Sequence, residues 1–140
     1  MKISIITVVY NNEKTIQDAM QSVLGQTYKN IEYVIIDGSS KDNTVNLIKE
    51  YKDQLGHFVS EKDNGLYDAM NKGIQACTGD VIGILNSDDL YQDSQVIAAV
   101  MEEFKKGQLN IGKSPKKVTS RKQAIAIALS EQKRVNSKKK

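Results

Sequence analysis

The sequence predicts an α/β fold in which a mostly parallel sheet is flanked by helices. Short runs rich in β-branched residues alternate with amphipathic segments of helical length, and polar turn residues follow each run. Strands that alternate with helices in this way form βαβ units, and right-handed crossovers place the helices on the faces of the sheet. A chain of 140 residues has the length of one domain.

The first half of the chain supplies two strands and two helices. Ile3–Val9 is almost continuously apolar, which is typical of a strand buried on both faces, and a second such run is Ile31–Ile36. Asn11 and Asn12 are expected to cap the first helix, and Asp42 is expected to cap the second. The apolar faces of these helices consist of Ile16, Ala19, Met20, Val23 and Leu24, and of Val45, Ile48, Tyr51 and Leu55.

The second half repeats the alternation. A short strand is expected at Phe58–Val59, a helix at Tyr67–Ala76 and a further strand at Asp80–Leu85. Met70, Ile74 and Cys77 are expected on the apolar side of that helix. Asp93 or Ser94 caps a last helix, which Gly107 ends. Its inward positions are Val96, Ile97, Val100, Met101 and Phe104.

The charge of the chain is unevenly divided. The net charge is +3, but residues 1–112 carry 10 lysines and 16 carboxylates, and residues 113–140 carry 10 cations and one carboxylate. We therefore expect two parts, residues 1–107 and residues 108–140. The second part begins as a linker, continues as a short basic helix with a capping box at Ser120 and Gln123, and ends in a disordered lysine-rich segment.

Several classes of protein are excluded by composition. No apolar run approaches the ~20 residues of a membrane span, and the N-terminus lacks the pattern of a signal peptide. The single cysteine cannot form an internal disulfide, and one cysteine with one histidine argues against a zinc site. We therefore expect a cytoplasmic protein. Neither a dinucleotide-binding glycine fingerprint nor a phosphate-binding P-loop is present.

Polar residues follow all four expected strands. Thr7 and Tyr10-Asn11-Asn12 follow the first, Asp37 the second, Glu61-Lys62-Asp63 the third and Asn86-Ser87-Asp88-Asp89 the fourth. Ligands of open parallel sheets bind outside these carboxyl ends, so at least five carboxylates are expected to face one crevice. A divalent cation, Mg²⁺ or Mn²⁺, would relieve their repulsion and neutralise a diphosphate there.

Four ordered segments then identify a family. The segments ISIITVVYNNEKTI, QSVLGQTYKNIEYVIIDGSSKDNT, SEKDNGLYDAMNKGI and TGDVIGILNSDD resemble the family 2 glycosyltransferases of the GT-A fold, of the kind that build bacterial surface polysaccharides. The resemblance implies binding of a nucleotide-diphosphate sugar, expected to be a UDP-sugar, with Mg²⁺ or Mn²⁺. It also implies inverting transfer of a hexose to a polysaccharide or lipid-linked acceptor.

The resemblance also implies roles for individual residues. Asp37 matches the carboxylate that recognises the nucleobase of the donor, and the pair Asp88 and Asp89 matches the metal-binding motif. The loop at Asp63 and the helix start after it match positions near the sugar and the diphosphate. The nucleotide-sugar site implied in this way consists of Thr7, Tyr10, Asn11, Asp37, Asp63, Gly65, Asp68, Asn71, Lys72 and Asp88.

The sequence departs from the family pattern after the metal motif. Inverting transfer needs a base, which in this family follows the motif by many tens of residues, whereas 51 residues follow Asp89 here. After Glu103 the only acid is Glu131. We therefore expect a truncated donor-binding half that is inactive for lack of a base, and that is marginally stable or self-associates. The tail resembles an uncharacterised family of small basic bacterial proteins.

Three alternatives remain open at this stage. The acidic pairs and loops also fit helix caps and turns, and Tyr10 and Lys72 also fit ordinary surface positions. The chain also fits a non-catalytic remnant whose 113–140 tail binds nucleic acid, another polyanion or an anionic membrane surface, which would place it at the inner membrane face. A nucleotidyltransferase also uses acidic strand ends, although the chain lacks a basic glycine-rich loop near its N-terminus.

Overall fold

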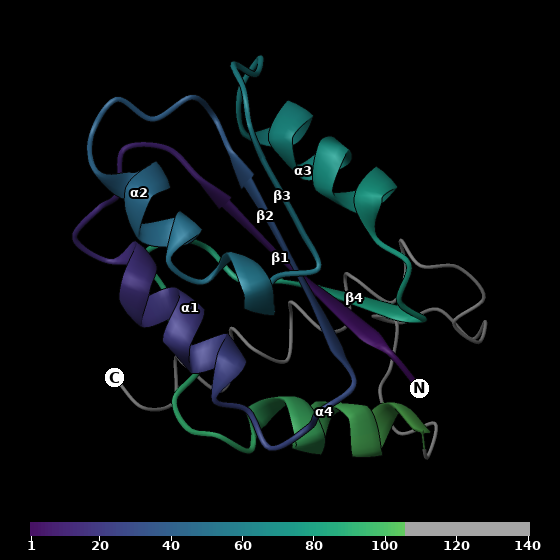
Figure 1. Cartoon of the computed structure of the whole chain (residues 1–140). Coiled ribbons are helices and arrows are strands. Elements are labelled where there is room, and N and C mark those ends of the chain that lie inside the picture. Colours follow the sequence, from purple (N-terminus) through teal and green to yellow (C-terminus); the bar gives the residue numbers. More distant parts are fainter. Residues whose placement is uncertain (106–140) are drawn as a thin grey trace.

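The computed structural model describes residues 1–105 (Figure 1). The elements of the first half are β1 (Ile3–Val9), α1 (Ile16–Leu24), β2 (Ile31–Asp37) and α2 (Thr44–Lys49), followed by a short 3-10 helix at Lys52–Gln54. Those of the second half are β3 (His57–Ser60), α3 (Leu66–Ala76), β4 (Val81–Ile84) and α4 (Val96–Lys105). The predicted α/β alternation is confirmed.

The four strands form one parallel sheet in the order β3-β2-β1-β4. β1 pairs with β2 from Ile3 opposite Ile31 to Val9 opposite Asp37. β4 pairs with the other side of β1, beginning with Val81 opposite Ile3. The chain therefore reverses its direction across the sheet between β3 and β4, and the crevice outside β1 and β4 is the position where parallel sheets bind ligands.

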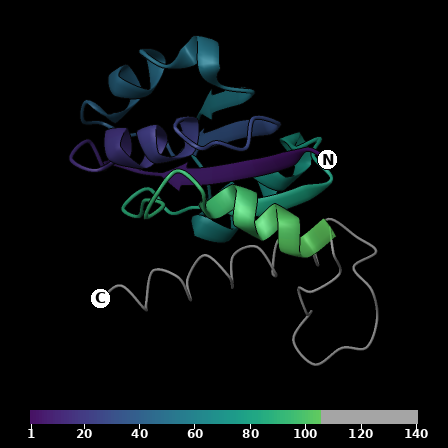
Figure 2. The same cartoon turned by 90° about the horizontal axis from the view of Figure 1, so that it is seen from below.

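Alternating strand residues build two cores. One core combines side chains of β1 and β2, such as Ile5 and Ile35, with α1, α2 and α4. The other combines Ile6, Val34 and Ile82 with α3, which lies across the sheet from α1 and α2 (Figure 1). Figure 2 shows the strands in their order from β3 to β4, with α4 beside the β4 end of the sheet.

The element boundaries differ from expectation in small ways. β2 reaches one residue further, to Asp37, and α3 begins one residue earlier, at Leu66. Neither Asn11 nor Asn12 caps α1, because its N-cap is Thr15 and the Asn11 side chain bonds to another loop. At α2 the N-cap is Asn43, although the Asp42 carboxylate accepts a hydrogen bond from the Thr44 amide (2.9 Å).

The expectations for the tail lie outside the described residues. These are the boundary at 107, the capping box, the basic helix, the lysine-rich end and every role of residues 113–140, so all of them stay predictions. Across residues 1–105, no helix combines the length and the apolarity that a bilayer crossing requires. All four residues of β4 are buried, and the expected marginal stability and self-association stay predictions.

Candidate functional site

The loops that follow the four strands meet at the carboxyl edge of the sheet. The loop after β1 carries Tyr10 and Asn11, and the loop after β2 begins at Gly38. The β3–α3 loop contains Asp63, and β4 leads into the acidic segment at Asp88-Asp89. Hydrogen bonds between the loops hold them together.

Asp37 ends β2 and is completely buried. Its carboxylate accepts hydrogen bonds from the Ser40 amide (2.9 Å), the Ser40 hydroxyl (2.5 Å) and the Ser60 hydroxyl (2.7 Å). The neighbouring Gly38 lies so close to Asp63 that an added Cβ would approach its carboxylate to 2.8 Å. The protein itself thus supplies three hydrogen-bond donors to Asp37. Recognition of the nucleobase by this carboxylate stays a prediction.

Asn11 joins the β1 loop to the β2 loop. It adopts a left-handed backbone conformation with φ of 47°, which asparagine tolerates better than most residues. Its side-chain Oδ1 accepts a hydrogen bond from the Lys41 amide (2.7 Å), and its own amide donates to the Ser40 hydroxyl (2.7 Å). Tyr10, directly before it, is 56% exposed, so its ring is accessible to a ligand.

Thr7 does not reach the carboxyl edge of the sheet. It is completely buried, and its hydroxyl shares a 2.8 Å hydrogen bond with the hydroxyl of Tyr33, which is buried as well. Thr7 has the same odd-numbered register as Ile3, Ile5 and Val9 and lies two residues before the end of β1. The resemblance placed Thr7 in the nucleotide site, whereas the structure places it in the core.

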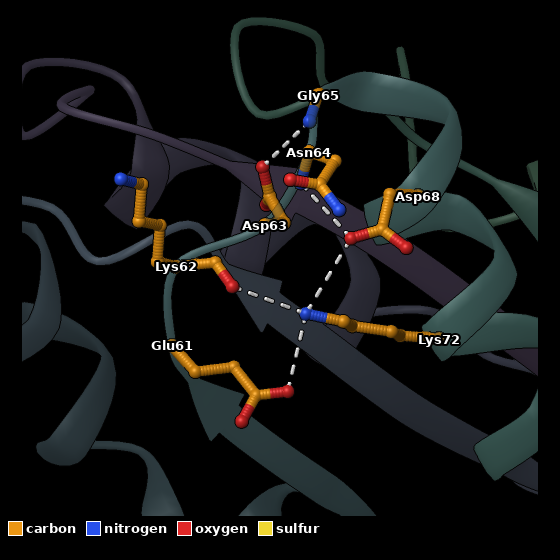
Figure 3. Close-up of polar contacts among 7 residues, drawn as sticks. All are labelled: Glu61, Lys62, Asp63, Asn64, Gly65, Asp68 and Lys72. Carbon is orange, nitrogen blue, oxygen red and sulfur yellow. Dashed lines mark hydrogen bonds and ion pairs between the residues drawn. The ribbon is translucent and has the colours of Figure 1, made fainter.

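The β3–α3 loop is organised around Lys72 (Figure 3). The Lys72 ammonium lies 3.1 Å from the Glu61 carboxylate and 3.6 Å from that of Asp68, and it donates to the Lys62 carbonyl (3.3 Å). The hydrogen bond with Glu61 and the charges of Asp68 and Asp63 raise the pKa of Lys72 despite some desolvation. Lys72 therefore joins its own helix, which also carries Asp68, to Glu61 in the β3–α3 loop.

Asp63 and Asp68 bind backbone amides of the same loop (Figure 3). Asp63 accepts a hydrogen bond from the Gly65 amide (3.0 Å), and Asp68 accepts one from the Asn64 amide (3.0 Å). Gly65 has φ of 109°, a conformation that residues with a side chain rarely adopt. These contacts give Asp63, Gly65 and Asp68 structural roles in the loop, whereas Asn71 on α3 is exposed.

The segment after β4 presents the acidic pair. Ser87 is buried, Asp88 is exposed and Asp89 is half-buried. The Asp89 amide donates to the Asn86 carbonyl (3.0 Å), and the Asn86 side-chain amide is 3.5 Å from the Asp89 carboxylate. Within residues 1–105, the Asp88 carboxylate makes no hydrogen bond or ion pair. Asp88 is thus open to a ligand.

The expected gathering of at least five carboxylates in one crevice stays a prediction. Among residues 1–105, no three His, Cys, Asp or Glu side chains lie close enough together to hold a metal ion. The remaining donor set, Asp88 and Asp89, still fits Mg²⁺ or Mn²⁺, because such ions commonly bind one or two carboxylates, with phosphate oxygens and water as further ligands.

The sequence did not indicate which residues connect the loops. Asn12, Thr15 and Ser87 join the β1 loop to the acidic segment, and Ser40 and Ser60 bind Asp37. The signal available in the sequence is the density of hydroxyl and amide residues after each strand. That density indicates turns, and it does not indicate which loop each side chain contacts.

Residues 4–136 match the family model described as Glycosyl transferase family 2. The chain belongs to glycosyltransferase family 2. The match runs past residue 107, and the comparisons lend no support to the resemblance of the tail to a separate family of small basic proteins.

Two curated relatives illustrate the extent of the similarity. An uncharacterized glycosyltransferase of Mycobacterium tuberculosis is 36% identical over 101 residues, which are 71% of this chain and 38% of the relative. One from Rickettsia typhi is 37% identical over 94 residues, 67% of this chain and 29% of the relative. This glycosyltransferase family 2 chain therefore spans well under half the length of these relatives.

Solved structures share the fold. S. aureus TarS in complex with UDP-GlcNAc has a TM-score of 0.69 at 22% identity and covers 76% of this chain and 32% of its own. The mannosyltransferase PcManGT from Pyrobaculum calidifontis, in complex with GDP-Man and Mn²⁺, has a TM-score of 0.67 at 22% identity and covers 72% and 31%. The family 2 domain therefore has a GT-A-like fold.

Proposed function

We propose that this chain is the donor-binding part of an inverting hexosyltransferase that uses a nucleotide-diphosphate sugar, with a UDP-sugar as the expected donor. The acceptor is a hydroxyl of a polysaccharide or of a lipid-linked saccharide. The observation that carries the proposal is the open Asp88 carboxylate, which follows the strand at which the sheet order reverses. The complexes named for TarS and PcManGT support it by fold analogy.

Different residues of the described part of the chain bind different parts of the donor. The exposed ring of Tyr10 stacks on the nucleobase, and Asn11 holds the loop that carries Tyr10. Asp37 holds the loop after β2 through Ser40 and, as the resemblance implies, accepts a hydrogen bond from the nucleobase. Asp88 and Asp89 hold Mg²⁺ or Mn²⁺ against the diphosphate. When bound, this metal supplies positive charge that stabilises the leaving diphosphate.

Transfer also requires a base that takes the proton of the acceptor hydroxyl. The carboxylates of residues 1–105 that lie at the carboxyl edge are either engaged in loop contacts or belong to the metal pair. We therefore assign donor binding to the described residues and place the base, the acceptor site and turnover of the chain outside this assignment.

Calorimetric titration of the full chain with UDP tests the proposal. We expect binding in Mn²⁺ that a chelator weakens by about tenfold or more, because the diphosphate then loses its counter-charge. The variant Asp88→Ala with Asp89→Ala should bind UDP equally weakly with and without Mn²⁺. The control Glu50→Ala with Asp53→Ala removes two exposed carboxylates elsewhere and should bind like the wild type.

Two results would refute the proposal. One is a folded wild-type chain that does not bind UDP, GDP or their sugars in Mn²⁺. The other is metal-dependent binding that survives in the Asp88 and Asp89 variant, since the metal would then be held elsewhere.

A further inference from the structure

The residue before the acidic pair is held by a different loop. The Asn12 side-chain amide donates to the Ser87 hydroxyl (2.9 Å), and the Thr15 hydroxyl donates to the Ser87 carbonyl (2.9 Å). Both donors belong to the segment between β1 and α1, 75 and 72 residues away in the chain. Ser87 is 9% exposed, and both contacts are partly buried.

We propose that Asn12 and Thr15 are positioning residues, which orient the Asp88–Asp89 pair for the metal-bound diphosphate through Ser87. The inference rests on the proposed function for its ligand. It goes beyond that function because the orientation of the metal-binding pair then depends on the β1–α1 loop, which is the loop proposed to contact the nucleobase of the donor.

The geometry supports this because Ser87 is bound at two points. A hydroxyl bond fixes its side chain and a carbonyl bond fixes its peptide plane, and that peptide leads directly into Asp88. Asp88 itself has no such contact within residues 1–105, and Asp89 has only its amide bond and a 3.5 Å contact with Asn86. The direction of both carboxylates therefore depends on the fixed Ser87 peptide.

The same segment is anchored at its other end. The Asn12 amide donates to the Thr44 hydroxyl (2.9 Å), and Asn11 is joined to Ser40, which binds Asp37. Hydrogen bonds and the Asn11–Asn12 peptide thus connect the buried carboxylate of Asp37 to Ser87, which directly precedes the acidic pair. Loosening this connection at Ser87 should weaken the contribution of the metal to nucleotide binding and leave binding without metal unchanged.

Amide hydrogen exchange in the ligand-free chain is the first readout. Asn12→Ala, Ser87→Ala and Thr15→Val each remove one contact to Ser87. We expect the Asp89 amide to exchange about three- to tenfold faster in each variant, the factor that corresponds to one neutral hydrogen bond. The control Asn46→Ala removes an exposed side-chain amide that bonds to Asn43 on the α2 side, and it should leave Asp89 exchange unchanged.

The second readout is the factor by which Mn²⁺ tightens UDP binding. This factor should fall about three- to tenfold in Asn12→Ala and in Ser87→Ala, and the double variant should lose little more, because both changes remove the same bond. A merely structural contact would lower the melting temperature of these variants and leave the factor unchanged.

The outcomes separate the two claims. A wild-type chain that does not bind UDP refutes the proposed function, and Asp89 exchange then decides by itself whether Asn12 and Thr15 hold the acidic segment. Unchanged exchange in all three variants overturns the inference, as does an unchanged Mn²⁺ factor in a chain that binds UDP. If Asn12→Ala does not fold, Ser87→Ala tests the same bond from its other end.

Discussion

Replacing Thr7 by valine separates two roles of one residue. The family resemblance places Thr7 at the nucleotide, whereas the structure buries it completely and pairs its hydroxyl with that of Tyr33 at 2.8 Å. Valine keeps the branched shape of threonine and removes the hydroxyl. We therefore expect Thr7→Val to lower the free energy of unfolding and to leave UDP binding unchanged.

The loss in the free energy of unfolding depends on the Tyr33 hydroxyl that stays in the core. After Thr7→Val the Tyr33 hydroxyl stays buried without this partner, and an unsatisfied buried hydroxyl costs ~1–3 kcal/mol. Burial raises the pKa of Tyr33, so ionisation offers no relief. Tyr33→Phe should cost a similar amount. The double variant removes both hydroxyls, so its free energy should lie close to that of either single variant, with a coupling of ~1–3 kcal/mol.

Urea unfolding of the four proteins measures the coupling, and calorimetry with UDP and Mn²⁺ measures the second role. We expect UDP affinities within about twofold of the wild type, a difference of under 0.5 kcal/mol. If Thr7→Val weakens UDP binding about tenfold and Tyr33→Phe does not, Thr7 contacts the nucleotide and the assignment to the core is refuted.

Three further results are expected from the described residues. Partial burial raises the pKa of Glu32, but hydrogen bonds from Ser4 and Thr78 outweigh this effect and leave the pKa below its usual 4.5. The stability that Glu32 contributes is therefore full above pH 4.5 and is lost as the pH falls through the lowered pKa. Urea unfolding across this pH range should show that the stability of Glu32→Gln and that of the wild type converge in acid. Gly73→Ala would bring a Cβ to 2.7 Å from Ile6, and despite the better helix propensity of alanine it should cost ~1–2 kcal/mol, measured by the same unfolding assay. Lys72→Met should speed proteolytic cleavage of the β3–α3 loop, and added salt should shrink the difference from the wild type.

The fold was accessible from the sequence because hydrophobic periodicity reports burial directly. The strand Ile3–Val9 was predicted to the residue, and the helix at 16–24 was predicted by its apolar face, since a continuous apolar run and a 3.6-residue spacing leave little choice. The caps were not, because asparagine and aspartate side chains can bond to any nearby amide. Asn11 thus binds the β2–α2 loop and not the helix that it precedes.

The candidate site was accessible only in outline. Strand ends point to one edge of the sheet, and the acidic pair after β4 lies there. Whether a polar residue near a strand end faces the crevice or the core depends on its register within the strand. A resemblance of motifs does not report that register, and Thr7 shows the consequence.

The carboxylates at the carboxyl edge divide by what already binds them. Asp37 receives three hydrogen bonds from serines, Asp63 binds the Gly65 amide, and Asp68 binds the Asn64 amide and Lys72. A carboxylate whose lone pairs are occupied in this way would have to give up protein contacts to bind a cation. Within residues 1–105, Asp88 has no such contact to lose, and its neighbour Asp89 would lose only the 3.5 Å contact with Asn86. The proposed placement of the metal at Asp88 and Asp89 therefore rests less on the number of acids than on the protein contacts that already engage the other carboxylates.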